Sequence, residues 1–221
     1  MQPHLKFPLS LHYRSPHSGL HLQKDGVYRL IHHLSYPENN SINDFIDKEF
    51  YSVQYSSVDE VAALISKHKK LARLSQCDVK SAFRILPISP ADFDLLEITF
   101  QEEYYFDKML PMGASISCAL WEKFATVLHW IAQQESGDEN ILHYLDDFLF
   151  VELVDTFTVG ETLHVFEKVC REIGVPLAKD KTTKPYTVLT FLGIEFNSQK
   201  LVMRLSIEKL ANLVTAGTFE P

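Results

Sequence analysis

The sequence predicts an α+β fold in which an antiparallel sheet packs on helices. Short apolar runs that read as strands alternate with longer runs of helical period. Several strand pairs are separated only by a tight turn, and such a turn joins neighbouring strands in antiparallel order. With 221 residues, of which 46% are hydrophobic, the chain is long enough to bury a core in one or two subdomains.

The first part of the chain predicts one strand, one helix and a second strand. Residues 1–22, and the stretch up to about residue 27, are rich in His, Pro and Ser and predict an irregular lead-in. A short strand is expected over Val27–Ile31, and a loop over 37–41. Ser57 and Glu60 have the spacing of a capping box, so a helix is expected to begin there. A strand should follow over 72–79. The apolar residues at helical spacing are Val61, Leu64, Ile65 and Leu71.

The middle of the chain predicts a hairpin and a long helix. Glu97–Phe100 and Tyr104–Lys108 read as two strands that turn at 101–103, and 110–113 reads as a turn. Ser115–Gln134 predicts a buried helix. Its expected buried stripe consists of Ile116, Leu120, Phe124, Val127 and Ile131.

The last part of the chain predicts a second hairpin, a helix and two strands. His143–Val151 places two adjacent carboxylates between apolar runs, which predicts a hairpin with these carboxylates at or near its turn. Thr158–Glu161 is a second capping-box pattern, for a helix that ends at Gly174. Strands are expected over 191–196 and 201–205, and a further helix could begin at Ser206.

Composition argues in part against a nucleic-acid partner. The formal net charge of −8 differs from the basic surface that such proteins usually carry, although a local basic groove can coexist with an acidic whole. The three cysteines, Cys77, Cys118 and Cys170, are sparse and odd in number, which fits a reducing compartment and an intracellular location, with cytoplasm and nucleus both open. No secretory signal and no apolar run of about 18 residues is present, so no membrane segment is expected.

Three aspartates are candidate metal ligands. If the strand that carries Asp78 lies beside the 143–151 hairpin, its carboxylate converges with Asp146 and Asp147. Three such groups cannot all stay ionised without cations. Two Mg²⁺ (or Mn²⁺) ions about 4 Å apart would neutralise them and clamp both oxygens of an in-line phosphoryl transfer. Ordinary turn chemistry for the Asp pair, and a capping role for Asp78, are the alternatives.

The order of these segments resembles the palm of reverse transcriptases. Residues 77–83 (CDVKSAF) look like the first catalytic motif, 110–115 (LPMGAS) like the second and 144–147 (YLDD) like the third. Residues 174–181 look like the fourth, and 191–194 like the primer grip. The amino-acid sequence of residues 31–37 and 110–113 most resembles that of retrotransposons that encode a tyrosine recombinase, the Ngaro-like group. The resemblance covers about residues 20 to 210.

This resemblance implies the fold of a right-hand polymerase palm with a partial fingers subdomain over 23–205. It also implies that the protein functions as an RNA-directed DNA polymerase. Such an enzyme adds dNTPs to a primer 3′ end on an RNA or DNA template. Because the chain stops at Pro221, we expect 206–221 to be only the start of a thumb, with the thumb otherwise largely absent. RNase H and recombinase domains are expected in the parent element and are absent here.

The resemblance also implies a role for individual residues. Asp78 and Asp146 would hold the two metal ions, with Asp147 as a weaker ligand. Lys181, with Lys179 as a substitute, would protonate the pyrophosphate leaving group, although both could be plain surface lysines. The implied nucleotide-binding residues are Arg29, Lys24, Val79, Phe83, Met112 and Gly113, and the implied primer-grip residues are Phe191, Leu192 and Gly193.

Several of these roles have a structural alternative. Phe83 matches an aromatic gate that excludes a 2′-hydroxyl, but ordinary core packing would also explain it. Gly193 could allow close approach of the primer or could mark a strand bulge. Met112 stands where retroviral relatives usually carry Gln, which we interpret as a feature of the lineage. Two other functions stay open: a non-catalytic truncated or co-opted remnant, and another nucleotidyl transfer such as cyclase chemistry.

Overall fold

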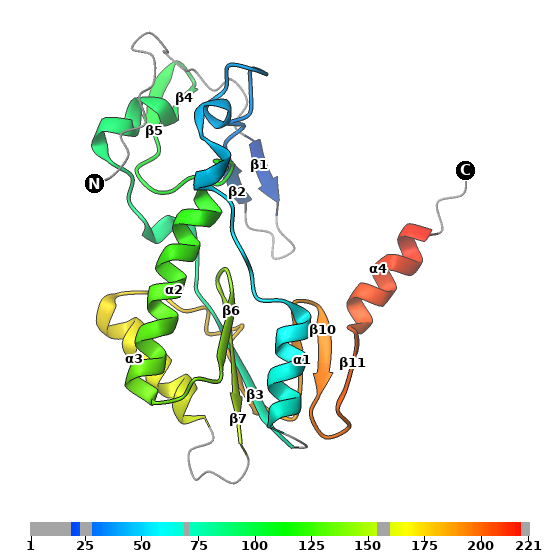
Figure 1. Ribbon diagram of the computed structural model, residues 1–221. Helices are drawn as coiled ribbons and strands as arrows, with labels where there is room; N and C mark the ends of the chain where they lie inside the picture. Colours follow the sequence, from blue (N-terminus) through cyan, green and yellow to red (C-terminus); the bar gives the residue numbers. More distant parts are fainter. Residues whose placement is uncertain (1–18, 23–27, 69–70, 154–159, 218–221) are drawn as a thin grey trace. The chain divides into compact units, whose positions relative to one another are not determined.

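The computed structural model describes residues 19–22, 28–68, 71–153 and 160–217, and the chain divides into two compact units (Figure 1). Unit 1 combines Met1–Val53 with Ser81–Phe124. Unit 2 combines Gln54–Lys80 with Ala125–Pro221. Each unit is therefore built from segments that are distant in the sequence.

Unit 2 is organised around a four-stranded antiparallel sheet. The strands, in their order across the sheet, are β6 (Ile141–Tyr144), β7 (Asp147–Glu152), β3 (Arg73–Asp78) and β8 (Thr183–Tyr186). This confirms the predicted strand before Asp78 and the predicted 143–151 hairpin. Strand β8 was not predicted, because Thr183–Tyr186 lacks an apolar run.

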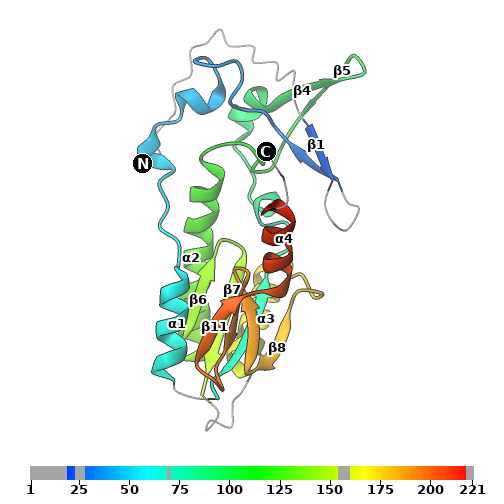
Figure 2. The same cartoon turned by 90° about the vertical axis from the view of Figure 1, so that its right-hand side faces the viewer.

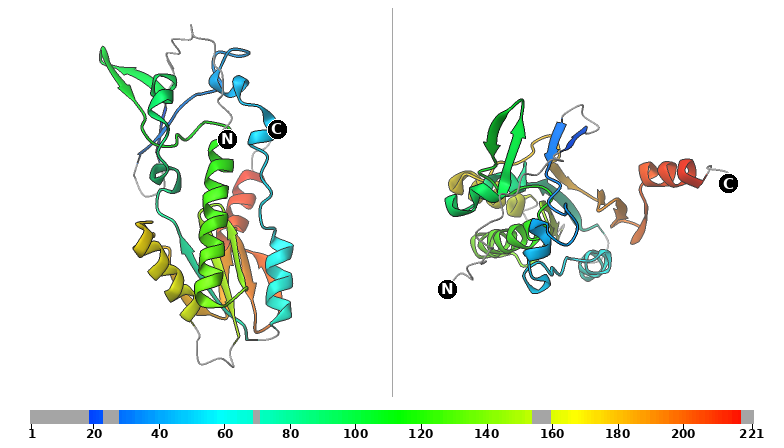
Figure 3. Two further views of the ribbon diagram at one scale, coloured as in Figure 1. Left: turned by 60° about the vertical axis from the view of Figure 1, so that its left-hand side comes forward. Right: turned by 90° about the horizontal axis from the view of Figure 1, so that it is seen from above.

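Both faces of this sheet are covered. Strand β7 is buried from Phe148 to Glu152, and its side chains alternate between the two faces. On one face, Phe148 and Phe150 contact Phe166 of helix α3 (Glu161–Ile173), with ring centroids 4.5 and 5.3 Å apart. The second half of α2 (Ser117–Ser136) lies on the same side as α3 (Figure 3).

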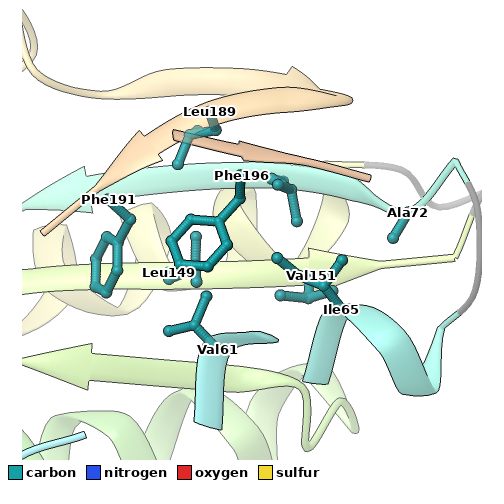
Figure 4. Close-up of a cluster of buried hydrophobic side chains, with 9 residues drawn as sticks. Val61, Ile65, Ala72, Leu149, Val151, Leu189, Phe191 and Phe196 are labelled. Carbon is teal, nitrogen blue, oxygen red and sulfur yellow. The ribbon is translucent and has the colours of Figure 1, made fainter. Parts of the chain in front are cut away.

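The other face carries helix α1 (Val58–Lys67) and a small three-stranded sheet. The strands of that sheet are β9 (Val188–Phe191), β10 (Ile194–Asn197) and β11 (Val202–Leu205), with β10 in the centre. Figure 4 shows the side chains of α1, β7, β9 and β10 meeting in one cluster. Each large apolar side chain buried in this way contributes about 1.5–3 kcal/mol, so this core fixes the sheet that carries Asp78 and Asp147.

Unit 1 contains two hairpins and several short helices. One hairpin is β1 (Gly19–Leu22) with β2 (Tyr28–Ile31), and the other is β4 (Glu97–Phe100) with β5 (Glu103–Phe106). The short 3-10 helices are η1 (Ile42–Phe45), η2 (Lys48–Phe50), η3 (Ala82–Ile85) and η4 (Pro90–Leu96). A small apolar core of Leu34, Ile42, Ile46 and Leu96 holds the loops together.

Local signals in the sequence predicted several boundaries correctly. Ser57 and Glu60 form the expected reciprocal cap of α1, with Glu60 N 3.2 Å from Ser57 Oγ and Ser57 N 2.6 Å from Glu60 Oε2. The strand β2 and the hairpin β4–β5 are also confirmed. After β11, helix α4 (Ile207–Gly217) begins where a helix was expected, and Figure 2 shows both elements.

Other predictions about local structure were wrong. Residues 19–22, expected to be irregular, form strand β1. Residues 191–196 are not one strand, because Leu192–Gly193 is a two-residue turn between β9 and β10. Leu71 is 47% exposed and follows the end of α1, so it is not on the buried stripe.

The predicted buried stripe of α2 was also wrong. Val127 is 54% exposed and Leu120 is exposed. The fully or nearly fully buried residues are Trp121, Ala125, Leu128 and Ala132. These residues recur at helical spacing, and the small alanines allow the helix to approach its neighbours closely. The prediction followed the bulkiest side chains and therefore selected the wrong face.

The cap of α3 differs from the prediction as well. Thr158 lies outside the described residues, and the helix begins after Gly160. The carboxylate of Glu152, at the end of β7, accepts hydrogen bonds from the backbone N–H groups of Gly160 and Thr162. The predicted C-terminal residue Gly174 is confirmed, with φ +78°. None of the helices in the described residues combines the length and hydropathy that crossing a bilayer requires.

Candidate active site

Two of the three candidate carboxylates face each other across neighbouring strands of unit 2. Asp78 is the last residue of β3 and pairs directly with Asp147, the first residue of β7. Opposed residues of antiparallel strands have Cβ atoms about 4.5–5.5 Å apart. Asp146 precedes Asp147 in the two-residue turn that joins β6 to β7. The strand register therefore brings the predicted Asp residues together at one end of the paired strands β3 and β7.

The turn that carries Asp146 is held from both sides. Leu145 has φ +53°, a left-handed conformation that costs a residue with a side chain about 1–2 kcal/mol. The N–H of Val79 donates to the Asp146 carbonyl at 2.8 Å, and the Tyr144 ring packs on Tyr55 at 4.8 Å between centroids. These contacts offset the cost of the turn and fix the position of Asp146.

The segment from Pro176 to Lys181 closes the other side of Asp78. Lys80 N donates to the Pro176 carbonyl, and Ala178 N donates to the Asp78 carbonyl, each at 2.9 Å. The segment ends with Lys181, whose Nζ donates to Asp78 Oδ2 at 2.8 Å. The predicted general acid is therefore in direct contact with a predicted metal ligand.

The electrostatics of the site shift the pKa values of two of its groups, Asp147 and Lys181. Burial, and then the charges of Asp146 and Asp78, raise the pKa of Asp147 to about 6. The hydrogen bond to Asp78 raises the pKa of Lys181 above its usual value, which keeps the ammonium group charged. The charges of Asp78, Asp147 and Asp146 all act on the ammonium group of Lys181, which bonds Asp78 directly.

This donor set suits a hard divalent cation in its chemistry. Carboxylate oxygens are the ligands that Mg²⁺ and Mn²⁺ prefer, and a cation would neutralise the charges of Asp146 and Asp78, which after burial raise the pKa of Asp147. Within the described ranges, no three His, Cys, Asp or Glu side chains are arranged so as to hold a metal ion together. Lys181 bonds one oxygen of Asp78, so a cation held there would share that carboxylate with the ammonium group.

The predicted nucleotide-binding residues are divided between the two units. Phe83, Met112 and Gly113 belong to unit 1, where Phe83 is half-buried in η3 and Gly113 has φ +115°. Val79 belongs to unit 2, and its side chain is fully buried. The backbone of Arg29 pairs with His21 in the β1–β2 hairpin. Lys24 lies outside the described residues.

The predicted primer-grip residues form the turn between β9 and β10. Phe191 is buried in the core, and Leu192 and Gly193 have φ +51° and +73°, so the turn has the left-handed residues of a tight hairpin rather than a bulge. The carbonyl of Leu192 accepts a hydrogen bond from Lys209 Nζ of α4 at 2.9 Å. Sequence reasoning missed Lys209, because no local pattern indicates that α4 returns to this turn.

A family model for reverse transcriptase (RNA-dependent DNA polymerase) matches residues 23–196. Protein P of heron hepatitis B virus is 28% identical over 127 residues, which are 56% of this chain and 16% of that protein. The Gag-Pro-Pol polyprotein of squirrel monkey retrovirus is 27% identical over 153 residues, which are 65% of this chain and 8% of that protein. The chain thus spans only a small part of these relatives.

Solved structures of foamy viral protease-reverse transcriptase have the same fold. The complex with double-stranded DNA superimposes with a TM-score of 0.69 at 19% identity, over 91% of this chain and 32% of that chain. The complex with an RNA/DNA hybrid gives 0.65 at 19% identity, over 91% of this chain and 24% of that chain. The predicted α+β fold with palm and fingers is confirmed. Since the family model covers most of its length, the chain belongs to the reverse transcriptase (RNA-dependent DNA polymerase) family.

Proposed function

We propose that this chain carries the nucleotidyl-transfer site of an RNA-directed DNA polymerase. The observation that supports this most directly is the cross-strand pair of Asp78 and Asp147 with Asp146 in the adjoining turn. In the reaction, the primer 3′-hydroxyl loses its proton to water, its oxygen forms a bond to the α-phosphorus of a dNTP, and the bond from that phosphorus to the pyrophosphate oxygen breaks. A site for this reaction must hold the attacking oxygen of the primer and the leaving oxygen of pyrophosphate in line with the α-phosphorus. It must also protonate the pyrophosphate that leaves.

In this proposal the aspartates bind the metal ions and Lys181 supplies the proton. Asp78 and Asp146 would hold divalent ions of the kind that the family generally uses, with Asp147 as a weaker ligand. When bound, these ions would neutralise the phosphates and the attacking oxygen. Lys181 holds a proton on Nζ beside Asp78, where it can pass to the departing pyrophosphate. Leu145 and Val79 keep the turn of Asp146 in place.

The template and primer form the second substrate. Foamy viral reverse transcriptase has been solved with double-stranded DNA and with an RNA/DNA hybrid, which supports a similar duplex as the partner of this chain. In this proposal Arg29, Lys24, Phe83, Met112 and Gly113 contact the incoming nucleotide, and the turn of Leu192 and Gly193 contacts the primer. Residues 23–205 would form fingers and palm, and 206–221 the first part of a thumb.

The same proposal extends to the origin of the chain. The amino-acid sequence of residues 31–37 and 110–113 supports an origin in the Ngaro-like group of retrotransposons, which encode a tyrosine recombinase. RNase H and recombinase domains would then belong to the parent element, and the chain would act inside the cell.

Primer extension tests the proposed reaction. We expect Mg²⁺- or Mn²⁺-dependent incorporation of dNTPs on poly(rA) and on a DNA template. Asp146→Asn should lower the rate by about 1000-fold, because several kcal/mol of charge stabilisation are lost with the carboxylate. Asp59→Asn is the matched control, since Asp59 is an exposed aspartate of the same unit, on helix α1. Incorporation that survives Asp146→Asn, or no incorporation by the unchanged chain, would contradict the proposal.

A further inference from the structure

A buried carboxylate in unit 1 joins three separate segments of the chain. Asp107 follows strand β5, and its side chain is only 5% exposed. Its Oδ2 accepts a hydrogen bond from Arg84 Nη1 at 2.5 Å and lies 3.1 Å from His32 Nε2. Its Oδ1 accepts from the N–H of Met109 at 3.1 Å. Both oxygens of one carboxylate are thus bound by donors from three places.

The carboxylate is ionised in this arrangement. Burial alone would raise the pKa of Asp107, but the hydrogen bonds from His32 and Arg84 outweigh it and hold the pKa well below its usual range. Facing an ionised carboxylate, His32 Nε2 carries the hydrogen of the shared bond. Charged hydrogen bonds of this kind are shorter and stronger than neutral ones, so the position of each donor is narrowly defined.

Each of the three segments also carries a residue that we propose to contact the nucleotide. Arg84 directly follows Phe83 in η3. Met109 leads into the loop of Met112 and Gly113. The third segment, which contains His32, follows the strand of Arg29. Asp107 is therefore the common attachment point of segments whose proposed partner is one ligand.

The loop at 112–113 is fixed to the same group of residues. His32 N donates to the Met112 carbonyl at 2.9 Å. A Cβ atom on Gly113 would lie 2.0 Å from the His32 carbonyl oxygen, so the two backbones are in close contact. Asn43 makes two hydrogen bonds to the same loop: its Nδ2 donates to the Gly113 carbonyl, and its Oδ1 accepts from Ser115 N, each at 2.9 Å.

The helix η3 needs an external anchor of this kind. It is four residues long, its first flanking residue Ser81 has φ +55°, and no side chain caps it. Short 3-10 helices have poor hydrogen-bond geometry and little stability of their own. Leu110 N donates to the Leu86 carbonyl at 2.8 Å, which fixes the exit of the helix. The hydrogen bond from Arg84 to Asp107 is a side-chain contact that holds the helix next to Phe83.

Packing does not account for the charged group. The apolar core of unit 1, formed by Leu34, Ile42, Ile46 and Leu96, is built without Asp107. A buried ion pair adds little stability over an apolar replacement, but removal of one partner leaves an uncompensated charge. The carboxylate fixes orientation, because the three donors Arg84, His32 and Met109 N must all point at the two oxygens of Asp107.

We propose that Asp107 is a positioning residue for nucleotide selection, which acts through Arg84 and His32 on the placement of Phe83 and of the loop at 112–113. This inference rests on the proposed polymerase function. If Phe83 excludes the 2′-hydroxyl of ribonucleotides, a loss of the Asp107 contacts lets η3 shift and weakens that exclusion. A displacement of about 1 Å in a substrate-positioning group can cost a factor of about 100.

Nucleotide discrimination by Asp107→Asn tests the inference. The amide keeps the shape and can still accept from Met109 N, but it loses the charge that holds Arg84. We expect the KM for dNTP to rise and the preference for dNTP over NTP to fall, each by about 10-fold, with a smaller change in kcat. Asp92→Asn is the matched control, because Asp92 is an exposed aspartate of the same unit. Arg84→Ala should reproduce the effect, and the double variant should add little to it.

Two further measurements separate the possible failures. Amide hydrogen exchange should rise in Asp107→Asn at residues 83–86 and 110–113, with no change at 148–151 in the core of unit 2. The affinity for a fluorescent dATP analogue, measured without primer, should fall about 10-fold. A wild-type chain that extends no primer would refute the proposed polymerase function. Unchanged affinity for the dATP analogue in Asp107→Asn, whether or not the wild type extends a primer, would overturn the role of Asp107.

Discussion

Replacing Gly113 by alanine should destabilise the protein far more than the same change at another left-handed glycine. Gly113 has φ +115°, a conformation that L residues rarely adopt. An added Cβ atom would lie 2.0 Å from the carbonyl oxygen of His32. The obstacle is backbone rather than the end of a flexible side chain, so the loop itself has to move.

The expected loss follows from three contributions. The unfavourable backbone conformation costs about 1–3 kcal/mol. The displacement needed to relieve the steric overlap costs about 1–3 kcal/mol. That displacement also weakens the hydrogen bond from His32 N to the Met112 carbonyl, 2.9 Å long, which contributes about 1 kcal/mol. We therefore expect Gly113→Ala to lower the free energy of unfolding by about 3–7 kcal/mol.

Gly174→Ala provides the matched control. Gly174 has φ +78° at the C-terminal cap of α3, and nothing lies within 4 Å of its added Cβ atom. Only the left-handed conformation is penalised there, so a loss of about 1–2 kcal/mol is expected. Urea titrations followed by tryptophan fluorescence, to which the buried Trp121 and the exposed Trp130 both contribute, and by circular dichroism would give both values. Equal losses for the two variants would refute the steric reasoning.

The remaining predictions concern the core of unit 2 and its response to pH. Phe166→Ala should lower the free energy of unfolding by about 3–5 kcal/mol, because the ring is fully buried, whereas Trp130→Ala, at a 58% exposed position, should change it by less than about 0.5 kcal/mol in the same titration. His129 and His143 are joined at 2.8 Å between their Nδ1 atoms, and burial lowers the pKa of each to about 4. Between that value and the ordinary pKa of 6.5 the two histidines bind more protons in the unfolded chain, so their contribution to stability should fall as the pH drops from 6.5 towards 4, against a smaller opposite contribution from Asp147. Replacing both histidines with leucine should flatten this dependence in thermal unfolding across the same pH range, and an unchanged slope would contradict the assignment.

The candidate carboxylates could be found from local patterns, but their pairing could not. The Asp pair in a tight turn, and an Asp at the end of an apolar strand, are visible in a few residues of sequence. The register that sets Asp78 opposite Asp147 depends on contacts between distant strands, and a shift of one residue would turn each side chain to the other face. The resemblance to the family, rather than the local pattern, supplied that pairing in advance.

The wrong predictions share a physical cause. The face of α2 that packs most closely uses Ala125 and Ala132, which a search for bulky apolar residues does not select. The cap of α3 comes from Glu152, which lies on a strand before the helix and not in the capping pattern. Asp107 follows the aromatic end of β5 with no local pattern that names a partner, and the fold brings in Arg84 and His32. In each case the deciding contact joins elements whose spacing in the chain says nothing about their contact in space.

The position of β3 in its sheet bears on how the protein is made. β3 pairs with β7 on one side and with β8 on the other, and both are synthesised well after it. Lys181 follows Asp78 by 103 residues, so at about 5–20 residues per second the ribosome needs about 5–20 seconds to supply it. Until β7 has been synthesised, β3 has two unpaired edges, and until β8 has been synthesised it has one; unpaired strand edges favour aggregation of a nascent chain. The carboxylates also meet only when this late pairing forms, so the electrostatic repulsion between them does not oppose the earlier steps of folding.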